Sequence, residues 1–221
     1  MHINVKRLSS VHSKVKEIVL RKQLKTNPKV IAVTKTFKEH DIMPLVDFNH
    51  IHFGENKVQE AENKWKSIKL KYPNLKLHML GPLQTNKAKK ALQLFDYIHS
   101  LDNEKLAKKL SENEKDSTKK VKIFIQVNIA DEKQKSGIPI KDLSNFYHYC
   151  KENLSLNIIG LMCLPPFDLD SNEFFNTLKR EARKLQLKDL SMGMSNDYEK
   201  AINNESTYIR LGTAIFGERK I

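Results

Sequence analysis

The sequence is poor in the residues that build several common kinds of site. It has only two cysteines, Cys150 and Cys163, whose spacing fits no metal-binding motif, so we expect reduced thiols, Cys150 on a helix and Cys163 at a strand end. No apolar run approaches the length of about 20 residues that a membrane span needs. Residues 1–7 lack the apolar core of a signal peptide. We therefore expect a cytoplasmic protein without a membrane partner.

Glycine and proline are also scarce, with seven of each among 221 residues. No stretch rich in proline, glycine or serine separates two parts of the chain, and no internal repeat is evident. A chain of this length can bury one sizeable core. The sequence therefore predicts a single domain over residues 1–221.

Acidic residues are outnumbered, with 26 Asp and Glu against 39 Lys and Arg and a net charge of +13. Such a charge is typical of nucleic-acid-binding proteins. However, the excess is nearly all lysine spread along the predicted helices, and aromatic side chains that could stack on bases are not interleaved with it. Even the densest cluster, Lys87, Lys89 and Lys90, fits the exposed side of a helix. We expect solvated helix faces, no nucleic-acid partner and long-range attraction of anionic ligands.

What the sequence does contain is a regular succession of strand and helix patterns. Short apolar runs predict eight strands, at residues 30–33, 51–53, 76–80, 97–100, 121–127, 157–162, 189–192 and 207–211. Apolar residues at helical spacing predict helices at residues 8–19, 41–47, 58–68, 88–95, 106–110, 143–150, 174–185 and 198–202, with a last turn at 214–216. This alternation favours an α/β fold, a (β/α)8 TIM barrel with an additional N-terminal helix. A doubly wound sheet alternates too, but eight units in this length favour closure.

Lys35 ends the first buried strand. In α/β barrels the carboxyl ends of the strands share one face, where the chemistry takes place. A lysine there is either a solvated charge or an amine in a pocket, where desolvation makes it nucleophilic toward a carbonyl. The strand alone leaves both readings open.

Two glycine loops offer a phosphate site at the same face. Barrels often bind phosphate in the loops after strands seven and eight, which here are Gly193-Met194-Ser195 and Gly212-Thr213. Each combines a glycine with a hydroxyl donor, although glycine can also simply turn a tight corner. The strand ends contain no His/Cys metal cluster and no serine with evident histidine and acid partners, so we predict neither a metal nor a catalytic residue.

A lysine and an anion site together fit a phosphorylated aldehyde, and pyridoxal 5′-phosphate (PLP) is the candidate cofactor. Arg210, at the end of strand eight, would face the pyridine nitrogen. Because a guanidinium stays protonated, it can only donate to that nitrogen, which leaves the ring a poor electron sink. This pairing favours holding the cofactor over carbanion chemistry.

Ordered motifs along the chain resemble those of the pyridoxal phosphate homeostasis protein family, single-domain relatives of the alanine racemase amino-terminal barrel. The motifs are Ala32-Val33-Thr34-Lys35-Thr36, Phe53-Gly54-Glu55-Asn56 with Gln59-Glu60, Gly81-Pro82-Leu83-Gln84 with Asn86-Lys87, Lys135-Ser136-Gly137, Gly160-Leu161-Met162, Leu190-Ser191-Met192-Gly193-Met194-Ser195 with Asp197, and Arg210-Leu211-Gly212-Thr213-Ala214-Ile215-Phe216-Gly217-Glu218-Arg219.

The resemblance implies a specific set of PLP contacts. It implies a Schiff base at Lys35, Asn56 beside the ring, Arg210 at the pyridine nitrogen, Met194 near the phosphate, and phosphate contacts from Ser195, Gly212 and Thr213. Two departures stand out. Phe37 lies where the family pattern often has a second lysine, two residues after the Schiff-base lysine, which puts in doubt a role for a second lysine in handing the cofactor on. Glu205-Ser206-Thr207 lies where the family pattern often has Gly-Ser-Thr. Lys135 matches the family and is a candidate for cofactor transfer, with a solvated loop lysine as the alternative.

The resemblance also implies a function in intracellular PLP homeostasis, with no efficient catalysis. The protein would bind and buffer PLP and deliver it to apo-enzymes, and we expect a monomer. The sequence ends soon after the eighth unit, so we expect no second domain to supply an opposing tyrosine, whereas racemisation needs groups on both faces of the α-carbon. A slow PLP-dependent amino-acid racemase or lyase is the alternative function, and a basic nucleic-acid-binding module is a second one.

Overall fold

The protein forms a closed parallel barrel. The computed structural model describes residues 1–25, 27–115, 119–132 and 134–218. Within these ranges the strands pair in parallel in the order β4-β3-β2-β1-β9-β8-β7-β5, β6 lies beside β5, and pairing of β4 with β5 closes the ring. Their bounds are β1 Lys29–Val33, β2 His52–Glu55, β3 Lys76–Met79, β4 Tyr97–Leu101, β5 Lys122–Asn128, β6 Ile138–Pro139, β7 Ile158–Cys163, β8 Asp189–Ser191 and β9 Tyr208–Leu211.

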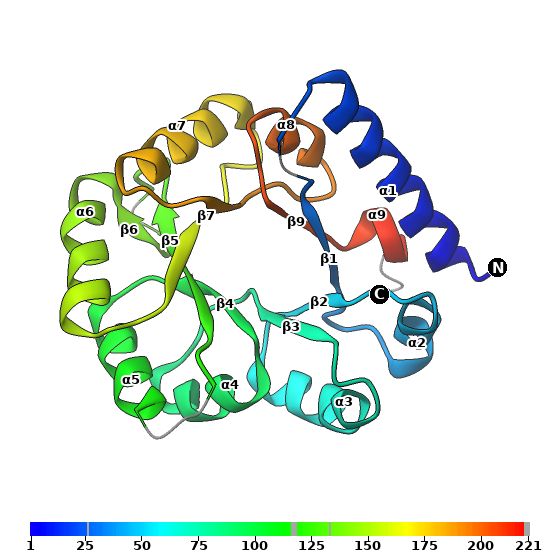
Figure 1. Cartoon of the computed structure of the whole chain (residues 1–221), viewed down its shortest axis with the longest axis horizontal. Coiled ribbons are helices and arrows are strands. Elements are labelled where there is room, and N and C mark those ends of the chain that lie inside the picture. Colours follow the sequence, from blue (N-terminus) through cyan, green and yellow to red (C-terminus); the bar gives the residue numbers. More distant parts are fainter. Residues whose placement is uncertain (26, 116–118, 133, 219–221) are drawn as a thin grey trace.

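Helices surround the ring of strands (Figure 1). They are α1 Ile3–Arg21, α2 Glu39–Asp47, α3 Val58–Lys71, η1 Thr85–Lys87, α4 Ala88–Leu94, α5 Glu104–Glu114, α6 Ile140–His148, η2 Tyr149–Asn153, α7 Ser171–Lys184, α8 Tyr198–Asn203 and α9 Thr213–Phe216. The extra helix α1 buries Leu8, Val11 and Val15, which recur at helical spacing. It packs beside α8 and α9 (Figure 1). The prediction of a (β/α)8 barrel with an additional N-terminal helix is confirmed.

The eight predicted strands all form, with ends that differ by at most two residues from those predicted. The short strand β6 was not predicted, because two residues carry no alternation pattern. The helix predicted at residues 143–150 ends as an α-helix at His148 and continues as the π-helical segment η2. The predicted single domain, residues 1–221, includes positions outside the described ranges and stays a prediction.

The apolar core lies mainly between the strands and the helices, where Phe53 and Trp65 are fully buried. A separate small cluster fills the inside of the barrel, and it consists of Ile31, Tyr97, Phe124, Met162 and Tyr208. Branched apolar side chains usually dominate barrel interiors. This interior instead contains several buried polar residues as well, namely His78, His99, Ser191 and Arg210.

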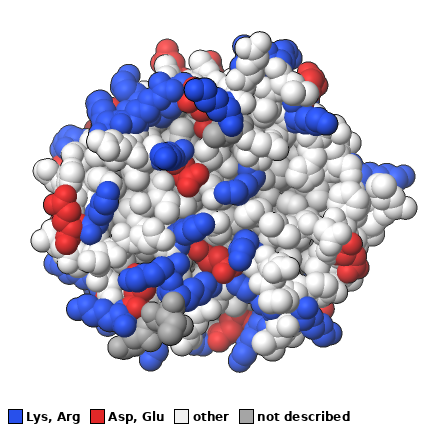
Figure 2. Space-filling view, in the orientation of Figure 1, with Lys and Arg blue, Asp and Glu red and all other residues white. Residues whose placement is uncertain are grey.

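Charge is spread over the surface. On the face shown in Figure 2, Asp and Glu side chains lie among those of Lys and Arg. Across the described ranges, no helix has both the length and the apolar character to cross a membrane. Cys150 and Cys163 are buried free thiols on η2 and at the end of β7, and burial raises the pKa of each to about 12.

Candidate functional site

A cavity of about 490 Å³ opens where β1, β2, β7, β8 and β9 lead into their following loops. All seven residues predicted as cofactor ligands line it: Lys35, Asn56, Met194, Ser195, Arg210, Gly212 and Thr213. These residues come from four separate segments of the chain. The closed barrel brings them together because its strand ends share one face.

Arg210 forms the buried wall of the cavity. Its guanidinium donates one hydrogen bond to Ser191 Oγ at 2.7 Å and another to the Cys163 carbonyl oxygen at 2.9 Å. Its side chain is almost fully buried, and this burial lowers the pKa of Arg210 from its ordinary value. An arginine nonetheless stays protonated near neutral pH. The cavity therefore contains a fixed positive charge that can donate hydrogen bonds but cannot accept them.

The loops after β8 and β9 are joined at the cavity. Ser195 Oγ accepts a hydrogen bond from the Ala214 backbone N–H at 3.2 Å, which ties the β8 loop to the start of α9. Gly193 has a φ of +95°, and an added Cβ would lie only 2.5 Å from the Ala201 Cβ. Gly193 is therefore required by its turn and by packing. At Gly212 an added Cβ would come no closer than 3.8 Å to its nearest neighbour, so the packing around it does not require glycine.

The Lys35 turn is held by its two neighbours in sequence. The Thr34 carbonyl oxygen accepts from Lys64 Nζ at 2.8 Å, and the Thr36 backbone N–H donates to Glu60 Oε1 at 2.7 Å. Thr36 adopts the left-handed φ of +70°, which is unfavourable for a residue with a branched Cβ. Helix α3, which carries Lys64 and Glu60, thus fixes the backbone on both sides of Lys35.

Beneath this turn lies the carboxylate of Glu55, which is fully buried at the end of β2. Its Oε1 accepts hydrogen bonds from Thr34 Oγ1 at 2.7 Å, Trp65 Nε1 at 2.9 Å and Lys64 Nζ at 2.9 Å. A buried charge is costly unless it is paired and hydrogen-bonded, and here the hydrogen bonds all reach Oε1, while the buried Oε2 has no hydrogen-bond partner among the described residues. The motif residue Glu55 therefore supports the Lys35 turn from below and does not line the cavity.

Asn56 follows Glu55 and lines the cavity, where its backbone packs closely on Gly81. An added Cβ at Gly81 would lie 2.4 Å from the Asn56 carbonyl oxygen. Gly81 is thus explained by the close approach of two strand ends.

The rim of the cavity includes exposed apolar side chains, of which only Met194 was predicted from the sequence. The exposed fraction is 88% for Phe167 and 56% for Leu169, both in the loop between β7 and α7, and 39% for Met194. Other lining residues that were not predicted are Val33, Leu80, Leu164, Pro165, Pro166, Ser171, Asn196, Asp197 and Lys200. In the sequence, the Pro165-Pro166 pair after β7 was the feature that indicated this loop.

The two family departures have structural explanations. Phe37 stacks on Phe216 of α9, with ring centroids 4.4 Å apart, so it packs the Lys35 loop against the helix that follows Gly212. Glu205 adopts a φ of +67°, the conformation that glycine would favour, while the buried Ser206 donates to the Met192 carbonyl oxygen at 2.8 Å. Glu205 therefore adopts a left-handed conformation in this turn although it is not a glycine.

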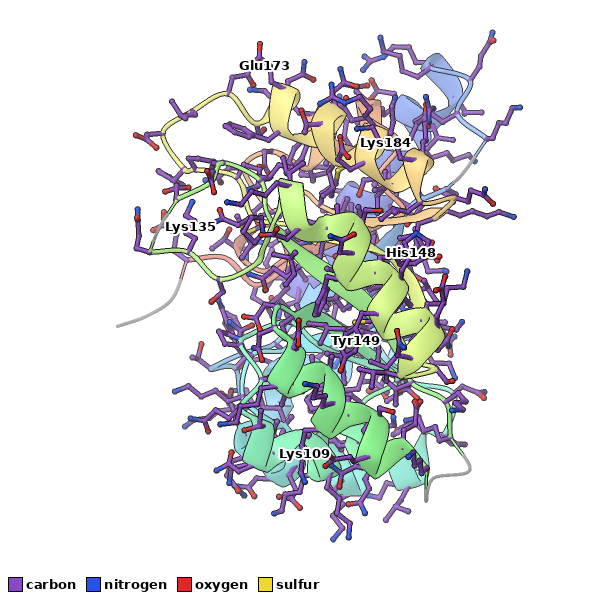
Figure 3. All side chains as sticks on the ribbon, turned by 90° about the vertical axis from the view of Figure 1, so that its left-hand side faces the viewer. Lys109, Lys135, His148, Tyr149, Glu173 and Lys184 are labelled. Carbon is purple, nitrogen blue, oxygen red and sulfur yellow. The ribbon has the colours of Figure 1, made fainter. Side chains whose placement is uncertain are left out.

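Lys135 lies on the loop before α6, at the edge of the molecule (Figure 3). Its ammonium pairs with Glu132 at 2.7 Å, and it is not among the residues that line the cavity. Its role in cofactor transfer stays a prediction.

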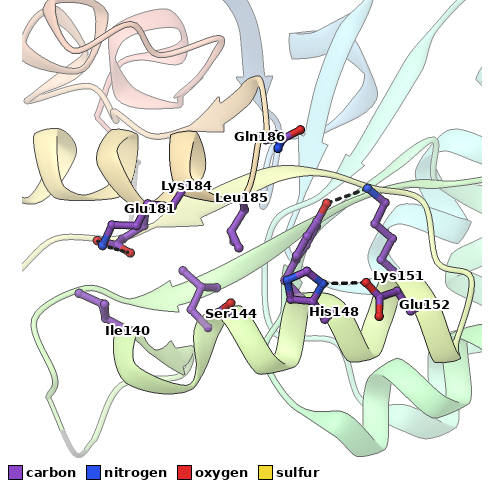
Figure 4. A pocket seen from close by; sticks show the side chains of 11 residues that line it. Ile140, Ser144, His148, Lys151, Glu152, Glu181, Lys184, Leu185 and Gln186 are labelled. Carbon is purple, nitrogen blue, oxygen red and sulfur yellow. Dashed lines mark hydrogen bonds and ion pairs between the residues drawn. The ribbon is translucent and has the colours of Figure 1, made fainter.

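A second groove of about 390 Å³ lies between α6 and α7 (Figure 4). Its polar side chains contact near neighbours, as in His148 with Glu152 at 2.8 Å and Lys184 with Glu181 at 2.8 Å. It contains none of the predicted site residues. Within the described part of the chain, no group of three or more His, Cys, Asp or Glu side chains could hold a metal ion.

Comparison with known proteins identifies the family. Residues 8–220 match the family described as alanine racemase, N-terminal domain. The pyridoxal phosphate homeostasis protein of Pasteurella multocida (strain Pm70) is 37% identical over 201 residues, which are 86% of each chain. That of Escherichia coli (strain K12) is 34% identical over 199 residues, 86% of this chain and 85% of its own.

Solved structures agree with this assignment. PipY of Synechococcus elongatus without PLP has a TM-score of 0.87 at 33% identity, and PipY with PLP bound has 0.83 at 34%. Each comparison covers 98% of this chain and 100% of PipY. Alanine racemase of Corynebacterium glutamicum, at 15% identity and a TM-score of 0.63 over 94% of this chain and 60% of its own, shares the fold. The chain belongs to the pyridoxal phosphate homeostasis proteins of the alanine racemase N-terminal domain family.

Proposed function

We propose that this protein binds PLP in the cavity at the strand ends, with Lys35 forming a Schiff base, and acts as a carrier that buffers the cofactor and delivers it to apo-enzymes. The observation that carries the proposal is the convergence of all seven predicted ligands on one cavity. PipY, the relative that covers this whole fold, has a structure with PLP bound.

The residues present fit the chemistry of PLP. The cofactor supplies an aldehyde that condenses with a primary amine, and Lys35 provides that amine. The phosphate would lie at Ser195, Gly212 and Thr213, where the open space at Gly212 leaves room for close backbone approach. Arg210 would donate to the pyridine nitrogen, and Asn56 would lie beside the ring.

Two features favour a carrier over a catalyst. Arg210 cannot supply a proton to the pyridine nitrogen, so the ring would stay a weak electron sink. Among the described residues that line the cavity there is no tyrosine, and Lys200 is paired with Asp170 at 2.8 Å. Proton transfer on two opposite faces of a substrate therefore lacks a second evident group. The monomeric state and the cytoplasmic location stay predictions.

Trapping of the covalent bond tests the proposal. The purified protein is incubated with PLP, reduced with borohydride, digested and analysed by mass spectrometry. We expect one phosphopyridoxyl group, on Lys35, and none in Lys35→Ala. Lys135→Ala is the matched control, because its ammonium lies outside the cavity, and it should keep the adduct on Lys35. An adduct on another residue, or no adduct at all, would refute the assignment.

A panel of L-amino acids separates the carrier from the alternative PLP-dependent racemase or lyase. The PLP-loaded protein should neither racemise nor cleave any of them at a rate above that of free PLP. Turnover that is lost in Lys35→Ala would establish the enzyme and overturn the carrier function.

A further inference from the structure

The inside of the barrel contains a continuous line of hydrogen-bonded polar side chains that ends on Arg210. His52 Nδ1 lies 3.0 Å from His78 Nε2, and His78 Nδ1 lies 2.9 Å from His99 Nε2. His99 Nδ1 lies 2.8 Å from Ser191 Oγ, which also accepts from Arg210. We call His52, His78 and His99 the imidazole file. It starts at the amino-terminal end of β2 and runs through β3 to β4, and the bond from His99 to Ser191 on β8 crosses the interior of the barrel.

The file replaces apolar packing, so its polar groups must be satisfied internally. His78, His99 and Ser191 are completely buried. The rings fit closely among aromatic side chains, with His78 stacked on Tyr97 at 4.2 Å and His99 stacked on Phe124 at 4.3 Å. A buried polar group without a partner is costly. An arrangement with one defined set of donors and acceptors is therefore required.

The direction of donation along the file follows from Arg210. Guanidinium has no acceptor, so Ser191 Oγ must accept from Arg210, and among the described residues His99 Nδ1 is the hydrogen-bond acceptor for the single proton of Ser191. With Nδ1 as acceptor, a neutral His99 carries its proton on Nε2 and donates to His78 Nδ1. The same rule makes His78 Nε2 donate to His52 Nδ1. All three rings are then Nε2-protonated.

Neutral rings are consistent with their surroundings. Burial, together with neighbouring histidines and Lys29, lowers the pKa of His78 well below the ordinary value. Burial and the charge of Arg210 do the same for the pKa of His99. His52, which is only half-buried, has its pKa lowered to about 4, mainly by burial and also by Lys29 and Lys76. The file therefore places dipoles and no second cation behind the arginine.

We propose that the imidazole file and Ser191 are positioning residues for Arg210, which orient its guanidinium toward the cavity through one fixed direction of hydrogen-bond donation from Arg210 to His52. The inference rests on the proposed function, because it concerns the arginine that would face the cofactor ring. It assigns a role to three histidines, each from a different strand, that do not line the cavity.

The first test uses the protein without PLP. Nitrogen-15 NMR of the histidine rings distinguishes the two neutral tautomers. We expect His78 and His99 to carry the proton on Nε2 at neutral pH. In Ser191→Ala, which removes the donor to His99 Nδ1, we expect a mixture of tautomers. Protonation of His99 or His78 on Nδ1 in the unchanged protein would overturn the direction of donation.

The second test uses PLP. His99→Phe should keep the stacking on Phe124 but cut the file. We expect the affinity for PLP to fall roughly tenfold, the change expected when a hydrogen-bonded charge loses its support, and the absorbance maximum of bound PLP to shift. Ser191→Ala should give the same two changes if His99→Phe fails to fold. His50→Phe is the matched control, because His50 is a buried histidine whose ring forms a hydrogen bond with the backbone carbonyl oxygen of His52 and none with the side chains of the file.

Unchanged affinity and absorbance in both His99→Phe and Ser191→Ala would overturn the positioning role. Failure of the unchanged protein to form an adduct at Lys35 would instead contradict the proposed function. In that case the tautomers measured without PLP would still decide the direction of donation within the file.

Discussion

Lys64 connects the helix α3 to the turn that presents Lys35. Its ammonium contacts the Thr34 carbonyl oxygen and the carboxylates of Glu55 and Glu60, at distances of 2.8 to 3.1 Å. Only 10% of the Lys64 side chain is exposed, and Glu55 is fully buried. A buried ion pair adds little net stability as a unit, but removal of one partner leaves a charge without compensation.

We therefore expect Lys64→Met to lower the free energy of unfolding by about 3 kcal/mol and to slow formation of the borohydride-trapped adduct at Lys35. Urea denaturation and timed trapping measure the two effects. Lys66→Met, on the exposed side of the same helix, is the control and should change stability by less than about 0.5 kcal/mol. Equal behaviour of the two variants would mean that Lys64 does not support the turn.

At the scale of elements, the loops after β8 and β9 each contain a glycine, and the two glycines lie in different physical surroundings. Gly193 is enforced by its positive φ and by helix α8, whose Ala201 would meet an added methyl group. Gly212 has an ordinary negative φ and open space around it. Packing therefore explains the first glycine, whereas packing does not require the second, which we propose contacts the phosphate.

This difference predicts opposite phenotypes for the two alanine variants. Gly193→Ala should lower the free energy of unfolding by about 2 kcal/mol or more, because it adds overlap to a strained conformation. Gly212→Ala should fold with stability within about 1 kcal/mol of the original, yet bind PLP more weakly, because the methyl group would occupy the space of the phosphate. Urea denaturation and PLP titration measure both effects. Unchanged PLP affinity in Gly212→Ala would show that the backbone there does not approach the cofactor.

For the whole molecule, buried histidines dominate the response to mild acid. Burial lowers the pKa of His50 to about 3 and that of His78 and His99 well below the ordinary value of 6.5. The unfolded chain protonates these rings near pH 6.5 and the folded protein does not. Below that pH the unfolded state binds more protons, so the free energy of unfolding falls as the pH falls.

We expect a loss of about 1 kcal/mol for each of these histidines between about pH 6.5 and pH 5.5. Carboxylates with a lowered pKa behave differently. Asp96, for example, is protonated in the unfolded chain only near its ordinary pKa of 3.8, so it affects the free energy of unfolding only at lower pH. Urea midpoints measured across this range, at fixed ionic strength, test the prediction. A midpoint that stays constant from pH 6.5 to pH 5.5 would mean that the buried rings are protonated in the folded protein.

The sequence by itself determined the order of the strands and helices, and with it the barrel. The spacing of apolar residues and the local composition can be seen in the sequence itself, so segments such as residues 121–127 could be predicted directly as strands. Lys35 and Arg210 could be predicted as neighbours because parallel strands that close a barrel end on one face. The left-handed turn at Glu205 and the two-residue strand β6 left no such local pattern.

Only the tertiary structure showed which side chains inside the barrel contact the residues at those strand ends. His52 and His78 each lie between two apolar residues, and His99 follows Ile98. Such a pattern does not tell which face of a strand is turned inward. Their hydrogen bonds depend on barrel closure and on the crossing from β4 to β8. The same holds for the support of Lys35 by Glu55 and Lys64, because a buried contact between side chains depends on packing between elements, which the local sequence pattern does not encode.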